Sequence, residues 1–120
     1  MVGSIDMVGR DVEFRVKTGS RATLQLTIAD SSGNAKDISN TVTYATGLWK
    51  VWKPDGTLII NGALTFTTRA SGVVSYALLA IDTVAANVGR WEGEVELIDS
   101  SGNISEQTKS FTYFQEESYW

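Results

Sequence analysis

Residues 76–97 read YALLAIDTVAANVGRWEGEVEL. The first residues continue an apolar alternation that begins at Val74, and the last residues place Trp91, Val95 and Leu97 on one face, opposite a row of glutamates. Alternation with a period of two is typical of a strand with one buried face. The segment DTVAAN (82–87) breaks this period and predicts a single helical turn. The stretch therefore predicts two strands joined by a short helical corner.

The same alternation extends in both directions from this stretch. It appears in VEFRVK (12–17), TLQLTIAD (23–30), GVVSYALL (72–79) and SFTYF (110–114). In LWKVWKPDG (48–56) we expect Trp49 and Val51 to point inward and Trp52 outward, unless a bulge at Gly47 reverses this parity. Short strands separated by frequent turn signals predict an all-β fold, a mostly antiparallel β-sandwich of about seven to nine strands.

The pentapeptide DSSGN occurs twice, at 30–34 and at 99–103. Each copy follows an apolar alternating run, where a hairpin must reverse, and Asp, Asn and Gly are favoured in tight turns. An EF-hand calcium loop would need a Glu about six residues after the Gly, whereas Ser39 and Thr108 occupy those positions. Both copies are therefore predicted to be turns rather than ion or phosphate sites.

The stretch at 76–97 also resembles the corner between strands E and F of immunoglobulin-like domains. An apolar strand, an Asp-Thr pair, a helical turn and a Gly-x-aromatic sequence follow one another in the same order. Trp91 stands where those domains often carry a Tyr whose hydroxyl bonds to the backbone. Because Trp91 has no hydroxyl, the resemblance leaves a tyrosine corner in the strict sense in doubt.

The order of features over residues 11–115 resembles the immunoglobulin-like N-terminal domain of upper baseplate and other tail proteins of tailed phages. The segments that carry the resemblance are FRVKTGSRATLQLTIADSSGNAKDIS (14–39), VWKPDGT (51–57), SGVVSYALLAIDT (71–83), GRWEGEVELIDSSGN (89–103) and FTYF (111–114). The resemblance implies a virion structural protein, assembled in the host cytoplasm, that contacts other virion proteins and forms a homo-oligomer in a tail, baseplate or fibre. Because the sequence ends at Trp120, we expect a small adaptor, with residues 1–10 as an N-terminal arm, 11–115 as the sandwich and 116–120 as a C-terminal tail.

The composition limits the kinds of catalytic and metal sites that the chain can form. The chain has 120 residues, a net charge of −4, no His and no Cys, so the usual zinc ligands and the Cys-His and Ser-His nucleophile systems are excluded. The basic residues are scattered, which argues against binding to nucleic acid. There is no apolar run long enough for a membrane span, and the N-terminal residues lack the pattern of a secretory signal. We therefore expect no enzyme, no catalytic or metal residues and no cofactor.

The candidate contact residues are aromatic. Trp52, Tyr119 and Trp120 are expected to contact partner proteins, because aromatic side chains dominate protein interfaces. The alternative is a small carbohydrate-binding or adhesion module, in which the exposed Trp52 would serve as a stacking platform for a glycan. Glu92, Glu94 and Glu96 are expected to form a solvated strand face, with a cation or partner surface, or a catalytic carboxylate pair, as alternatives.

Overall fold

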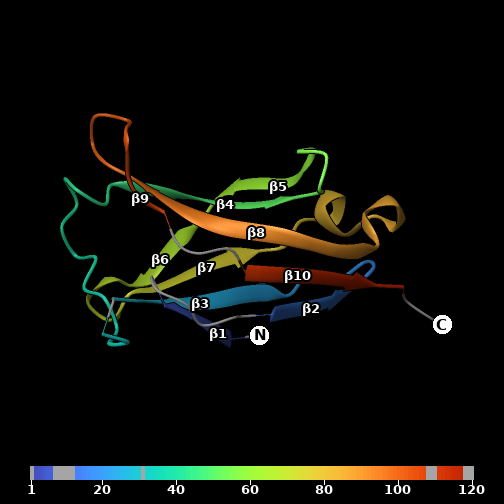
Figure 1. Cartoon of the computed structure of the whole chain (residues 1–120), viewed down its shortest axis with the longest axis horizontal. Helices are drawn as coiled ribbons and strands as arrows, with labels where there is room; N and C mark the ends of the chain where they lie inside the picture. The colour runs from blue at the N-terminus through green and yellow to red at the C-terminus, as the bar shows by residue number, and fades with distance from the viewer. Residues whose placement is uncertain (1, 7–12, 31, 108–110, 118–120) are drawn as a thin grey trace.

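The computed structural model describes residues 2–6, 13–30, 32–107 and 111–117, with the backbone alone for 2–6. The described residues form strands and three short 3₁₀ helices (Figure 1). The strands are β1 (Val2–Asp6), β2 (Glu13–Lys17), β3 (Thr23–Ala29), β4 (Thr46–Trp52), β5 (Leu58–Ala63), β6 (Thr65–Thr68), β7 (Val73–Ala77), β8 (Gly89–Ile98), β9 (Ile104–Gln107) and β10 (Phe111–Glu116). The helices are η1 (Arg69–Ser71), η2 (Ala80–Thr83) and η3 (Ala85–Asn87).

The strands form two sheets. One sheet has the order β1-β3-β7-β6, and the other has the order β2-β10-β8-β4-β5, with β9 paired to the end of β8. The pairings are antiparallel except for β1 with β3 and β2 with β10, which are parallel. The predicted all-β, immunoglobulin-like sandwich is confirmed. Without β1, which lies in the segment expected to be an N-terminal arm, the strands fall within the predicted number.

The core between the sheets is centred on Trp49. Its ring is fully buried and lies 5.4 Å from the ring of Phe14, 5.1 Å from that of Phe111 and 6.1 Å from that of Tyr76. The predicted parity is therefore confirmed, because Val51 is also fully buried and Trp52 is partly exposed. The irregularity in β4 lies between Val51 and Trp52, opposite β5, and not at Gly47.

Two core positions explain why glycine interrupts the apolar alternation of β8 and β4. A Cβ at Gly93 would lie 2.4 Å from the Phe111 ring and 2.6 Å from the backbone oxygen of Lys50. A Cβ at Gly47 would lie 2.9 Å from the side chain of Leu64. All three distances are shorter than the contacts that real Cβ atoms make, so these glycines allow the core side chains to pack against the sheet.

The helical corner predicted at 82–87 is present as η2 and η3. The indole Nε1 of Trp91 donates a hydrogen bond of 2.8 Å to the backbone oxygen of Asn87. This bond takes the place of the tyrosine hydroxyl bond, so the corner exists with a different donor. Trp91 is on the inward face of β8, as its parity predicts, but it is partly buried at the rim of the core.

The two DSSGN segments have matching hydrogen bonds. The Oδ1 of Asp30 accepts bonds from the backbone N–H groups of Ser32 and Asn34, and the Oδ1 of Asp99 accepts them from Ser101 and Asn103. Gly33 and Gly102 have φ of +84° and +86°, in the left-handed region that glycine adopts without strain. The prediction that both are turns is confirmed, and the repeat reflects one loop used twice.

The expectations for the two ends of the chain have different outcomes. Residues 2–6 of the expected arm form β1, which pairs with β3 from Val2–Gln25 to Asp6–Ala29. Residues 7–10 and the two aromatic residues of the tail, Tyr119 and Trp120, lie outside the described residues. The division into arm, sandwich and tail therefore stays a prediction.

Candidate functional site

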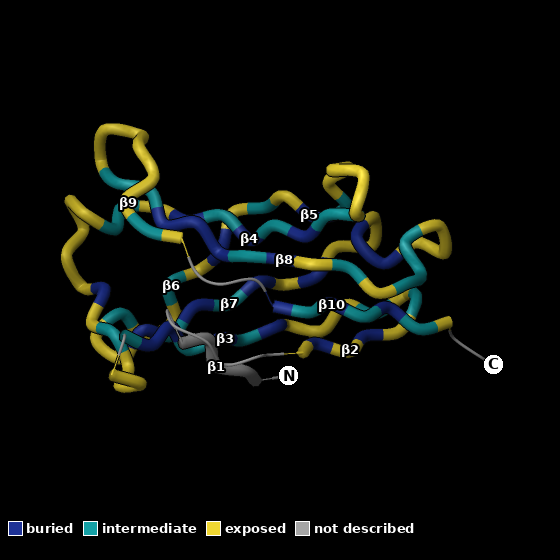
Figure 2. Tube along the Cα trace, in the orientation of Figure 1, coloured by how far each residue is buried: buried dark blue, intermediate teal, exposed yellow. Residues whose placement is uncertain are grey.

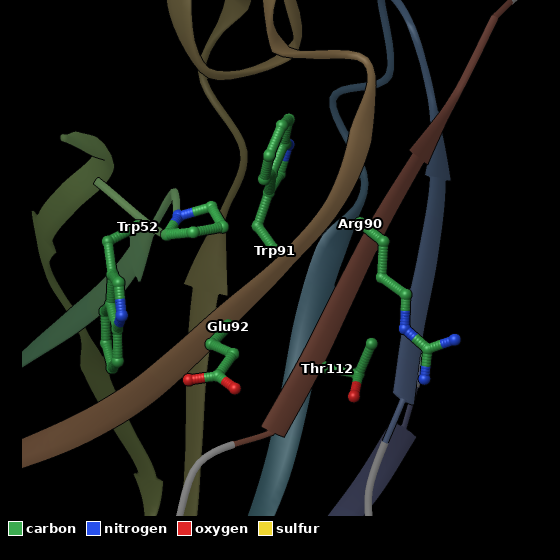
Figure 3. Close-up of a pocket in the computed structure, with 6 residues that line it drawn as sticks. Trp52, Arg90, Trp91, Glu92 and Thr112 are labelled. Carbon is green, nitrogen blue, oxygen red and sulfur yellow. The ribbon is translucent and has the colours of Figure 1, made fainter. Parts of the chain in front are cut away.

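The outer face of the six-stranded sheet carries a groove over strands β4, β8 and β10 (Figure 3). Trp52, Glu92 and Thr112 occupy directly opposed positions on these three strands and form one row across the sheet. Their side chains project to the same side because opposed residues in a sheet share a face. The groove has a volume of about 470 Å³ and is lined by Trp52, Pro54, Arg90, Trp91, Glu92 and Thr112.

The polar groups of this groove are free within the described structure. Arg90 and Glu92 are exposed and Thr112 is partly exposed, and none of these side chains makes a hydrogen bond or an ion pair with a described residue. The Trp91 ring, in contrast, is held by a hydrogen bond from its Nε1 to Asn87, and the Nζ of Lys53 lies over its face, 5.2 Å from the ring centre. The groove therefore combines a fixed aromatic wall with unoccupied donors and acceptors.

The glutamates on β8 differ in how far they are exposed. Glu92 is exposed, as predicted, whereas Glu96 is 6% exposed, so the prediction of a solvated face is wrong for this residue. The physical reason is that β9 pairs with this end of β8 and brings Gln107 over it. Lys50 contacts Oε1 of Glu96 at 2.8 Å, and Gln107 donates to Oε2 at 3.0 Å.

These surroundings shift the pKa values of the neighbouring carboxyls of Glu94 and Glu96 in opposite directions. Burial, together with the nearby charge of Glu96, raises the pKa of Glu94. Burial also opposes ionisation of Glu96, but the hydrogen bonds from Lys50 and Gln107 outweigh it, and the pKa of Glu96 is lowered. Because both oxygens of Glu96 are already engaged, the arrangement is that of a stabilising ion pair across β4 and β8, not of a catalytic pair facing a substrate.

A set of large apolar residues is exposed at the helical corner at one end of the sandwich, where Figure 2 shows exposed stretches of the chain. We call it the apolar cap, and it consists of Leu79, Ile81 and Val84, with exposed fractions of 57%, 72% and 42%. The sequence patterns did not predict the cap or the groove residues Pro54, Arg90 and Thr112. For the cap the available signal was a set of large apolar residues in and just before the helical turn predicted at 82–87.

Comparison with solved structures finds a phage domain with the same fold. The N-terminal domain of phage TP901-1 ORF48 has a TM-score of 0.73 and 12% sequence identity, over 97% of this chain and 99% of that chain. This confirms the predicted resemblance to a phage immunoglobulin-like domain at the level of the fold.

Two other solved structures are less similar. CopC from Methylosinus trichosporium OB3b has a TM-score of 0.45 and 16% identity, over 88% of this chain and 87% of that chain. The fibronectin(III)-like modules of Clostridium thermocellum CbhA have a TM-score of 0.44 and 14% identity, over 96% of this chain and 99% of that chain. No protein-family model and no curated protein matches the sequence.

The described residues contain no group of three or more His, Cys, Asp or Glu side chains placed to hold a metal ion. Nor does the described part of the chain include a helix of the length and apolar character that crossing a membrane requires.

Proposed function

We propose that this protein is a structural component of a tailed-phage virion that acts through protein–protein contacts and not through catalysis. The observation that carries the proposal is the similarity of fold to the phage TP901-1 domain, which extends over nearly the whole of both chains. Fold alone does not define function, so the proposal also depends on the surfaces of this chain. The lack of His and Cys supports it, because most nucleophile and zinc systems need them.

The apolar cap is the surface we propose for contact with a neighbouring virion protein. Large apolar residues that are exposed together in one short segment often mark a protein contact. The cap is held rigidly from below, because the buried Asp82 accepts hydrogen bonds from Tyr76 (2.7 Å) and from the backbone of Leu79 (2.8 Å). A rigid apolar surface loses little conformational freedom when it binds.

The C-terminal segment begins at the same end of the molecule (Figure 1). The Nε2 of Gln115, near the end of β10, donates to the backbone oxygen of Val84 in the cap at 2.9 Å. We retain Tyr119 and Trp120 as proposed contact residues and propose that they act together with the cap. Repeated copies in a homo-oligomer would then add many modest interfaces, which strengthens assembly by multivalency.

The proposal is tested by incorporation of a tagged chain into particles. We expect Ile81→Asp to abolish incorporation into purified virions, because a charge at the centre of the cap opposes its burial. Ile104→Asp is the matched control, since Ile104 is also exposed (53%) but lies on β9, away from the cap. The proposal is contradicted if the Ile81→Asp chain is incorporated normally, or if the unchanged chain is not incorporated into virions.

A further inference from the structure

The groove on the outer face of the sheet has a composition that protein contact does not explain. Its row of Trp52, Glu92 and Thr112 joins one partly exposed indole to a carboxylate and a hydroxyl. Arg90 adds a guanidinium group beside them (Figure 3). Glutamate is depleted at the centre of contacts between proteins, whereas Glu92 here lies in the middle of the row, between Trp52 and Thr112.

The backbone under the groove is not available to a peptide. Strand β8 is paired on both sides where Glu92 lies, to Trp52 of β4 and to Thr112 of β10. An added peptide strand needs a free sheet edge for its main-chain hydrogen bonds. A ligand here must therefore be recognised by side chains, and a polar ligand must match both donors and acceptors.

The charges of the groove favour an uncharged ligand. The two charged residues that line it, Arg90 and Glu92, have opposite signs. Neither is neutralised by a described residue. The carboxylate of Glu92 can therefore accept a hydrogen bond from a hydroxyl group, and the guanidinium of Arg90 can donate one to it. The volume of about 470 Å³ is within the range of small-molecule sites, roughly 300–1,000 Å³.

We propose that this groove binds a neutral carbohydrate. The C–H groups of a sugar ring carry partial positive charge and stack on the electron-rich face of the Trp52 indole. The carboxylate of Glu92 accepts hydrogen bonds from sugar hydroxyls, while Arg90 and Thr112 donate to sugar oxygens. Pro54 and the ring of Trp91, which packs at the rim of the core, also line the groove. The site is a glycan-binding surface, separate from the apolar cap, and it does not depend on the proposed virion role.

The test uses the full chain, biotinylated and displayed on streptavidin, against an array of neutral and acidic bacterial surface glycans. Display in several copies raises weak binding to a measurable level, by about 10²–10⁴-fold. We expect binding to one or more neutral glycans. Trp52→Ala and Glu92→Gln should each reduce apparent affinity by about tenfold or more, and Trp52→Tyr should retain binding because it keeps an aromatic platform.

The control is Glu117→Gln, the same change outside the groove, which should leave binding unchanged. Circular dichroism and thermal unfolding of each variant show that a loss of binding is not a loss of fold. The proposal is overturned if the chain binds no arrayed glycan, if it binds acidic glycans only, or if binding survives both Trp52→Ala and Glu92→Gln.

Discussion

The indole Nε1 of Trp91 lies 2.8 Å from the backbone oxygen of Asn87, four residues earlier in the chain. In immunoglobulin-like domains a tyrosine hydroxyl makes the comparable bond and fixes the corner between two strands. Here the indole N–H does so, and the same ring also forms a wall of the groove. One side chain therefore links the stability of the corner to the shape of a candidate binding site.

Replacing Trp91 by Phe should destabilise the fold by about 1–2 kcal/mol, because it removes this hydrogen bond and part of the buried ring. Trp52→Phe is the control, since Trp52 is partly exposed on the outer face and should change stability by less than about 0.5 kcal/mol. Urea denaturation monitored by circular dichroism measures both. Equal stabilities for the two variants would show that the corner bond does not contribute.

Loss of the hydroxyl group should lower the stability of the fold at Tyr76 but not at Tyr113. Tyr76→Phe removes the 2.7 Å bond to the buried carboxylate of Asp82 and should cost about 1.5–3 kcal/mol. The hydroxyl of Tyr113 is buried with no hydrogen-bond partner among the described residues. Tyr113→Phe should therefore leave stability unchanged or raise it by up to about 2 kcal/mol. Chemical denaturation of both variants tests this, and a large loss for Tyr113→Phe would contradict it.

The ion pair between Lys50 and Glu96 should make stability depend on pH. The folded-state pKa of Glu96 lies below its ordinary value of 4.5, so the pair stabilises the fold above that value and is lost as pH falls through the folded-state pKa. Lys50→Met should cost about 1–3 kcal/mol at neutral pH, because the partly buried carboxylate loses its cation. The difference from the unchanged chain should shrink as the pH falls below 4.5 and through the lowered folded-state pKa of Glu96. Unfolding curves at several pH values test this, and a constant difference would exclude it.

Glycine substitutions should separate backbone strain from steric conflict. Gly33→Ala and Gly102→Ala place a Cβ in open space, but at φ of +84° and +86°. Each should therefore lower the stability of the fold by about 1 kcal/mol. The two losses should be similar because the loops match. Gly93→Ala drives a Cβ into the Phe111 ring and should cost about 2–3 kcal/mol. Thermal unfolding ranks the three variants by stability. A Gly93→Ala variant as stable as the two loop variants would contradict tight packing between Gly93 and Phe111.

Local sequence patterns predicted the features that depend on neighbouring residues. Alternation in β4 places Trp49 inward because strand side chains have a period of two, and the DSSGN turns follow from the backbone preferences of Asp and Gly. The parallel pairing of β2 with β10 was not predicted, because alternation shows which face is buried and not which strand lies alongside.

The site was harder to predict because it is assembled across the sheet. Trp52, Glu92 and Thr112 are far apart in sequence and meet only through the register of three strands. The burial of Glu96 depends in the same way on where β9 pairs. The resemblance to phage domains indicated the fold, but its turn and alternation motifs carried no information on either the cap or the groove.

We propose that this chain is a repeated part of a phage particle. Quantitative mass spectrometry of density-purified particles, produced by cells that carry the gene, tests it most directly. We expect this chain to be present in several copies per particle, in a fixed ratio to other tail proteins. Its absence from particles that contain the other tail proteins would contradict the claim.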